Sequence, residues 1–151
     1  MVQIWELANS TANADLIDVC APGIMANLED PKTSGSILSS IEACGLIGLL
    51  TSPYVEGVAA EDKVKLVAAW MNSSTDELAL ANRVEHFEFI LQALDLRSLS
   101  PVFMIDIASG ETDCGLSKAC KKKLIQAWKK EQLSTHSLAF TTLTTMSCIP
   151  R

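Results

Sequence analysis

The residues of this chain that could do chemistry are few and poorly grouped. Its two histidines, His86 and His136, are far apart in the sequence, whereas a catalytic or zinc-binding histidine needs partners that converge on it. Cys114 and Cys120 are close together, but no further cysteine or histidine near them completes a tetrahedral zinc set. Lysines surround Cys120 without a base that would activate its thiol. The sequence therefore predicts no catalytic residue, no metal site and no cofactor.

The strongly basic segment of the chain is a run of lysines near its C-terminal end. These lysines could contact phosphate or an acidic partner, but lysine stems commonly cover apolar surface while their amines stay in water. The run also lacks the interleaved arginines and aromatic residues of a nucleic-acid surface, and the whole chain carries a net charge of −6. We therefore expect a solvated helix face and no nucleic-acid partner. The lysines concerned are Lys118, Lys121, Lys122, Lys123, Lys129 and Lys130.

The composition indicates a folded intracellular protein. Apolar residues make up 48 % of the chain and charged residues 20 %, which is typical of a packed domain. No uncharged apolar run reaches the ~18–20 residues that a membrane span needs, and the N-terminus lacks the pattern of a signal peptide. The five cysteines are an odd number at irregular spacing, which favours free thiols in a reducing compartment. We expect a cytoplasmic or nuclear location and no membrane partner.

The elements that must position any site are predicted to be helices. Glycine and proline are sparse, with 7 and 5 copies, so the fold class expected is all-α, an array of about seven or eight helices in antiparallel pairs. The tail over 134–151 shows no helical period and is expected to be an extended linker. Helices are expected over 2–9, from Asn13 with a kink or break at Pro22-Gly23, over 41–50 and 61–71, from Thr75 past Leu91, from Ser100-Pro101, and over 117–133.

The core prediction rests on two apolar stripes. One follows the helix over 61–71 and the other the helix after Thr75, each repeating every three or four residues. Packing of these two stripes against each other would make the array stiff. The expected core residues are Val64, Val67, Trp70, Met71, Val84, Phe87, Leu91, Pro101, Ile105, Leu124 and Trp128.

The first helix carries Trp5 between Ile4 and Leu7 and has few charges to form an outer face. Tryptophan is enriched at binding hot spots, which would make Trp5 an anchor for a partner. A helix with so few charges can equally bury this side chain in the core. Both interpretations stay open at the level of sequence.

Five short motifs follow one another in an order that resembles a known family, the BACK domain. This domain is the helical region between the BTB domain and the kelch propeller of BTB–kelch proteins. The resemblance covers roughly residues 2–133, and the final Pro150-Arg151 resembles the boundary where a kelch propeller begins. The motifs are Ala8 with Leu16 and Cys20, Leu46 to Ser52, the helix from Glu61 to Trp70-Met71-Asn72, Leu96-Arg97-Ser98-Leu99-Ser100-Pro101, and Cys120 to Leu124.

The resemblance implies a non-catalytic scaffold within a substrate adaptor for a cullin-RING ubiquitin ligase. In that family the BTB domain dimerises and holds the cullin, the propeller binds the substrate, and the BACK domain sets their distance and angle. The first BACK helices help form a hydrophobic groove for the N-terminal segment of the cullin. By position, Ile4, Trp5 and Leu7 would lie on that cullin side.

The same resemblance implies the partners and the domain boundaries. The partners would be a cullin, bound through an adjoining BTB domain, and the flanking BTB and kelch domains. Residues 1–133 would form the BACK-like domain, and residues 134–151 would lead toward a kelch domain that this chain lacks.

Two other functions remain open from the sequence. One is a stand-alone helical domain that binds other proteins and has no connection to ubiquitination. The other is an enzyme or a small-ligand carrier, which would require a buried pocket with converging polar groups.

Overall fold

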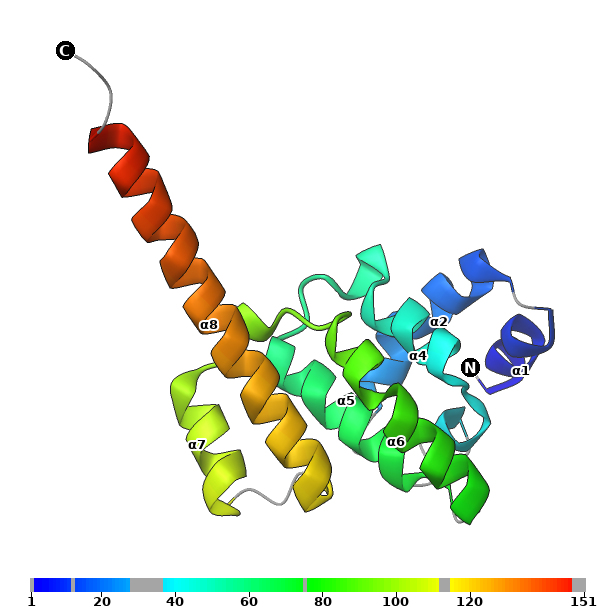
Figure 1. Ribbon diagram of the computed structural model, residues 1–151. Helices are drawn as coiled ribbons and strands as arrows, with labels where there is room; N and C mark the ends of the chain where they lie inside the picture. The colour runs from blue at the N-terminus through cyan, green and yellow to red at the C-terminus, as the bar shows by residue number, and fades with distance from the viewer. Residues whose placement is uncertain (1, 12, 28–36, 75, 112–114, 148–151) are drawn as a thin grey trace.

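Helices make up the fold in a computed structural model that describes residues 2–11, 13–27, 37–74, 76–111 and 115–147 (Figure 1). Within these ranges no residue belongs to a strand, which confirms the all-α prediction. A further helical turn covers residues 37–40. The elements are α1 (Val2–Thr11), α2 (Ala14–Ala26), α4 (Ala43–Leu50), the 3₁₀ turn η1 (Pro53–Val55), α5 (Ala60–Asn72), α6 (Glu77–Leu91), the 3₁₀ turn η2 (Leu96–Ser98), α7 (Pro101–Ser109) and α8 (Lys118–Ser147).

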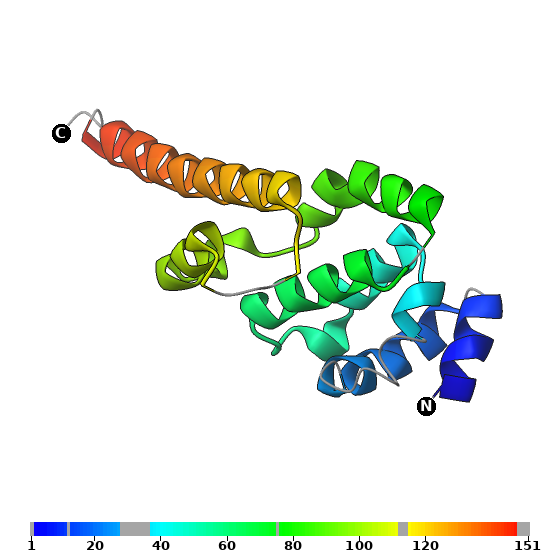
Figure 2. The ribbon, with the colours of Figure 1, turned by 90° about the horizontal axis from the view of Figure 1, so that it is seen from below.

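The helices follow one another through space much as they do along the chain. At the N-terminal end α1 packs on α2, and α2 contacts α4 and η1. In the centre α5 packs on α6, and α6 also contacts α4 and α8. At the C-terminal end α7 and η2 pack on α8. The two ends of the chain therefore lie at opposite ends of the molecule, and the last part of α8 projects beyond the other helices (Figures 1 and 2).

Side-chain caps begin α2 and α6, and the α-helices differ from expectation at the cap of α6 and at Pro22. Asn13 caps α2, as expected, by accepting a hydrogen bond of 3.2 Å from the Leu16 N–H. The cap of α6 is Asp76, which accepts from the Leu78 N–H, whereas the expected cap Thr75 lies outside the described residues. Pro22 does not break α2, which continues to Ala26. A proline inside a helix removes one backbone hydrogen bond, and the remaining turns carry α2 past Pro22 to Ala26.

Ser100 and Pro101 begin α7 in the way the sequence indicates. Ser100 Oγ accepts a hydrogen bond of 3.2 Å from the Phe103 N–H, and Pro101 takes the first helical position, where its missing N–H costs nothing. The Ser100 N–H in turn donates to Glu61 Oε1 of α5 over 3.1 Å. This hydrogen bond ties the start of α7 to the start of α5.

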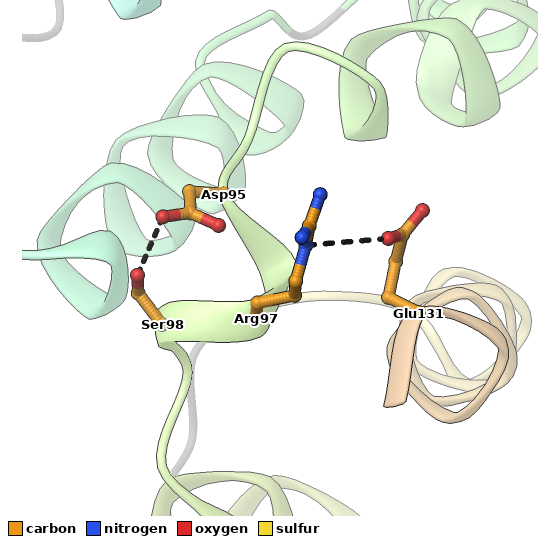
Figure 3. Close-up of polar contacts among 4 residues, drawn as sticks. All are labelled: Asp95, Arg97, Ser98 and Glu131. Atoms are coloured by element: carbon orange, nitrogen blue, oxygen red, sulfur yellow. Dashed lines mark hydrogen bonds and ion pairs between the residues drawn. The ribbon is translucent and has the colours of Figure 1, made fainter. Parts of the chain in front are cut away.

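Two further contacts fix the C-terminal helices to the centre. Asn72, at the end of α5, donates from Nδ2 to the carbonyl of Gly115 over 2.6 Å, just before α8 begins. Gly115 adopts a φ of 78°, which favours glycine. In the turn η2, Arg97 Nε lies 3.7 Å from Glu131 Oε2 of α8, while Ser98 donates to Asp95 beside it (Figure 3). The Asn72–Gly115 hydrogen bond and the buried side chains of Cys120 and Leu124 hold the first half of α8, whereas the exposed Arg97–Glu131 pair adds little stability.

The core extends without interruption from α1 to the first half of α8. Among the residues expected there, Val64, Val67, Trp70, Met71, Phe87, Leu91 and Leu124 are buried. Trp128 is only half-buried at the edge of this core, and its indole Nε1 has no hydrogen-bond partner in the part of the chain that the structure describes.

Three core predictions were wrong. Val84 is partly exposed because α6 turns Arg83, Phe87 and Ile90 toward the core instead. Ile105 is exposed, since α7 buries Met104 and Ile107 and so presents the opposite register. Pro101 is exposed at the first position of its helix, where it shapes the chain and adds nothing to the core.

The extended tail was also a wrong prediction. The last helix passes Leu133 and continues to Ser147. The stretch contains neither proline nor glycine, so nothing in it stops a helix once the packed first half has formed the nucleus. The part of α8 from residue 134 to Ser147 is therefore helical without a regular repeat of apolar residues along one side.

Candidate interaction surfaces

The indole of Trp5 holds α1 to the rest of the fold. This side chain is buried, and its Nε1 donates to Ser40 Oγ over 3.3 Å. Ser40 Oγ donates in turn to the carbonyl of Ile37 over 2.8 Å. Ala8, one turn further along α1, is also fully buried. Trp5 is therefore a core residue, and its assignment to the partner-binding side chains was wrong.

The other two residues expected to bind a partner do lie on the surface. Ile4 is 45 % exposed and Leu7 is 54 % exposed. Residues three apart lie on the same side of a helix, so these two side chains form one apolar strip on α1. We call this strip the α1 face. It is an exposed apolar surface on a helix that the buried Trp5 holds in place.

A second feature is an open groove beside α6, with a volume of about 860 Å³. Its α6 side is formed by residues at positions 78, 79, 82, 83, 86 and 89, which share one side of the helix. The opposite side is formed by the turn over 37–40 and the first turn of α4. We call this feature the α6 groove. Its lining residues are Ser39, Ser40, Ile41, Glu42, Ala43, Cys44, Ile47, Trp70, Asp76, Leu78, Ala79, Asn82, Arg83, His86 and Phe89.

Arg83 is the central charged residue of the α6 groove. Its side chain is only 5 % exposed, and the guanidinium lies over the Trp70 ring, 4.5 Å from the centroid. Nη1 donates to the Trp70 carbonyl and, over 2.7 Å, to Ser73 Oγ. Nη2 donates to the Ser39 carbonyl over 3.3 Å. The Trp70 indole is itself fixed, because its Nε1 donates to the Ile41 carbonyl over 2.8 Å.

The hydrogen-bond partners of Arg83 are all neutral. Among the described residues no carboxylate lies within 4.0 Å of its guanidinium. Burial lowers the pKa of Arg83 from its usual value, because the charged form has lost water. Arginine nevertheless stays protonated in proteins, so Arg83 is a buried cation that neutral acceptors and one aromatic ring compensate.

Two helix N-termini border the α6 groove and differ in their capping. The Asp76 carboxylate caps α6. At the start of α4, Glu42 occupies the cap position but its side chain makes no capping hydrogen bond. Ala43 and Cys44 of that first turn line the groove, so the positive end of the α4 dipole faces the same space as Arg83.

Arg83 is the functional candidate that sequence reasoning missed. A signal for it exists: Arg83, Phe87, Ile90 and Leu94 follow helical spacing, and all four are buried. A search for apolar residues alone selects Val84 as the buried position and passes over Arg83. This choice of Val84 is the wrong core prediction for α6 described above.

The described histidine and cysteine side chains do not gather into a metal-binding group. His86 Nδ1 lies 2.8 Å from the Asn82 carbonyl, and His136 has no described side chain. In the described parts of the chain, no three metal-binding side chains form a group. Cys20, Cys44 and Cys120 are free thiols, and Cys114 lies outside the described residues.

The lysine run occupies the first part of α8. Lys118, Lys122, Lys129 and Lys130 are exposed, whereas Lys121 and Lys123 are half-buried. Lys123 Nζ lies 3.4 Å from Glu88 Oε1 of α6. Because the Glu88 side chain is exposed and that of Lys123 is partly exposed, this pair adds little stability. Most of the run is the solvated helix face that the sequence indicates.

Comparison with known proteins adds no relative: no family model, no curated protein and no solved structure matches this chain. No described helix combines the length and the apolar character required to cross a bilayer.

Proposed function

We propose that this chain is a non-catalytic BACK-type module of a BTB–kelch substrate adaptor for a cullin-RING ubiquitin ligase. In this role it would hold a substrate-binding propeller at a fixed position relative to the BTB–cullin contact. The partners would be a cullin, bound through an adjoining BTB domain, together with the flanking BTB and kelch domains. The setting would be intracellular, in the cytoplasm or the nucleus.

The observation that carries the proposal is the α1 face. A cullin-side helix of such a module needs apolar side chains on its surface and a rigid attachment to the domain. Ile4 and Leu7 supply the apolar surface, and the buried Trp5 supplies the attachment through Ser40. The elongated order of the helices also suits a spacer, because its two ends lie far apart (Figure 1).

The stiffness that a spacer requires has a physical basis in the centre of the fold. Val64, Val67 and Met71 of α5 and Phe87 and Leu91 of α6 are buried in one continuous core. Close-packed interiors of this kind transmit displacement instead of absorbing it. A ligase adaptor would use this property to keep its substrate within reach.

The coding sequence on both sides of this chain tests the proposal. We expect a BTB domain upstream and kelch repeats downstream. A transcript that encodes neither would contradict the adaptor assignment.

The alternative is a stand-alone helical domain that binds other proteins without any link to ubiquitination. The α6 groove favours this candidate, because it offers a binding surface that needs no neighbouring domain. Binding of a partner by the isolated chain, together with the absence of BTB and kelch sequences, would support it.

A further inference from the structure

The α6 groove has a composition that points to one kind of ligand. We propose that it binds a peptide segment of a partner protein that presents a single carboxylate between two apolar side chains. This inference goes beyond the ligase assignment, because it concerns α4 and α6 and does not involve the α1 face.

Arg83 is the residue that would receive the carboxylate. Three of its N–H groups are donated to Trp70, Ser73 and Ser39. A guanidinium carries five N–H groups, so Nε–H and one N–H of Nη2 have no acceptor among the described residues. A carboxylate can accept a short, charge-assisted hydrogen bond from the Nε–H of such a guanidinium.

Arg83 and the start of α4 attract a negative group, while two acids in the lining limit how much negative charge the groove accepts. The α4 N-terminus, without a side-chain cap, presents backbone N–H groups to the groove, and the Asn82 side chain adds an amide. Two carboxylates, Glu42 and Asp76, also lie in the lining, and the second is already engaged with the Leu78 N–H. These two acids disfavour nucleic acid and other polyanions, whereas one carboxylate placed at Arg83 fits.

Apolar side chains mark the two ends of the groove on α6. Leu78 and Phe89 line the groove and are exposed. At 1.5 Å per residue they are separated by about 16 Å along the helix, which an extended segment of roughly five residues spans. Exposed large apolar side chains around a hollow are typical of a binding surface. They predict one apolar anchor on either side of the carboxylate.

Selection from a random 12-residue peptide phage library on the folded chain tests the proposal. We expect enriched sequences that carry Asp or Glu with an apolar residue on each side. A synthetic peptide from this set, measured by titration calorimetry, should bind Asn82→Asp about tenfold more weakly than wild type, because a second negative charge would face its carboxylate. Gln126→Glu makes the same amide-to-acid change on the exposed side of α8 and should leave binding unchanged.

A second pair of variants tests the apolar ends. Phe89→Ser should weaken the same peptide by about tenfold. Val102→Ser removes an equally exposed apolar side chain from α7 and should have no effect. All four substitutions are at exposed positions, so the melting temperatures of the variants should stay close to that of wild type.

Several results would overturn the proposal. The selection could enrich no peptide at all, or it could enrich peptides that lack an acidic residue. The selected peptide could also bind wild type and Asn82→Asp with equal affinity. A phosphoserine peptide that binds more tightly than its aspartate counterpart would assign the groove to phosphopeptides instead. None of these outcomes bears on the adaptor assignment, which depends on the α1 face and on the flanking domains.

Discussion

Two phenylalanines of α6 allow a direct test of how this helix is packed. Phe87 is 1 % exposed and Phe89 is 60 % exposed, although they stand two positions apart on one helix. Replacing Phe87 by alanine removes a ring from the centre of the core. The transfer of such a side chain to water accounts for about 1.5–3 kcal/mol, and the cavity left behind raises the loss to about 3–5 kcal/mol.

Thermal unfolding followed by circular dichroism measures this difference. For a chain of this length, 1 kcal/mol corresponds to a shift of roughly 2–4 °C, so Phe87→Ala should lower the melting temperature by roughly 6–20 °C. Phe89→Ala is the matched control, and its free energy of unfolding should change by no more than about 0.5 kcal/mol. Equal melting temperatures for Phe87→Ala and wild type, or equal losses in the two variants, would refute the packing described for α6.

Three further predictions concern other parts of the fold. Gly115→Ala should lower the free energy of unfolding by about 1–3 kcal/mol, because φ is 78° there and a Cβ would lie 2.6 Å from Asn72 Nδ2. Gly48→Ala, with no atom within 4 Å of its new Cβ, should instead raise it by about 0.4–1 kcal/mol. Urea unfolding of both variants measures these changes, and shifts of the same sign would contradict the prediction. Ser100→Ala should cost about 1 kcal/mol in the same assay, because it removes the N-cap of α7, and an unchanged midpoint would show that the cap is not needed. Burial raises the pKa of the Cys20 thiol, so the unfolded chain ionises this thiol at a lower pH than the folded chain, and the stability present below the unfolded pKa of about 8.5 should fall as the pH rises above it. Between about pH 7.5 and about pH 9.5, Cys20→Ala should lose less stability than wild type, and identical losses in the two proteins would contradict the assignment.

The sequence predicts helices well where local signals and burial agree. The caps at Asn13 and Ser100 and the apolar stripe on α5 could be read directly, because each depends on neighbours along the chain. The register of α7 could not, since apolar residues occupy both of its sides and only tertiary packing chooses between Ile105 and Ile107. Apolar character alone therefore does not identify the buried side of a short helix.

The candidate surfaces were predictable only in part. The α1 face follows from Ile4 and Leu7, but the sequence could not decide the position of Trp5, because its hydrogen bond joins residues far apart in the chain. Arg83 was missed for the same reason: its acceptors on Ser39, Trp70 and Ser73 come together only in the fold. A buried cation breaks the apolar pattern on which sequence reasoning depends.

The most direct test of the adaptor assignment is capture of a cullin by the full-length protein that contains this chain. We expect the wild-type protein to co-precipitate the cullin, and Ile4→Asp combined with Leu7→Asp to reduce the captured amount several-fold, because charge would replace the apolar α1 face. Val102→Asp, which places the same charge at an exposed position on α7, should capture as much cullin as wild type. Equal capture by all three proteins would remove the α1 face from the contact, and no capture by the wild type would contradict the adaptor function itself.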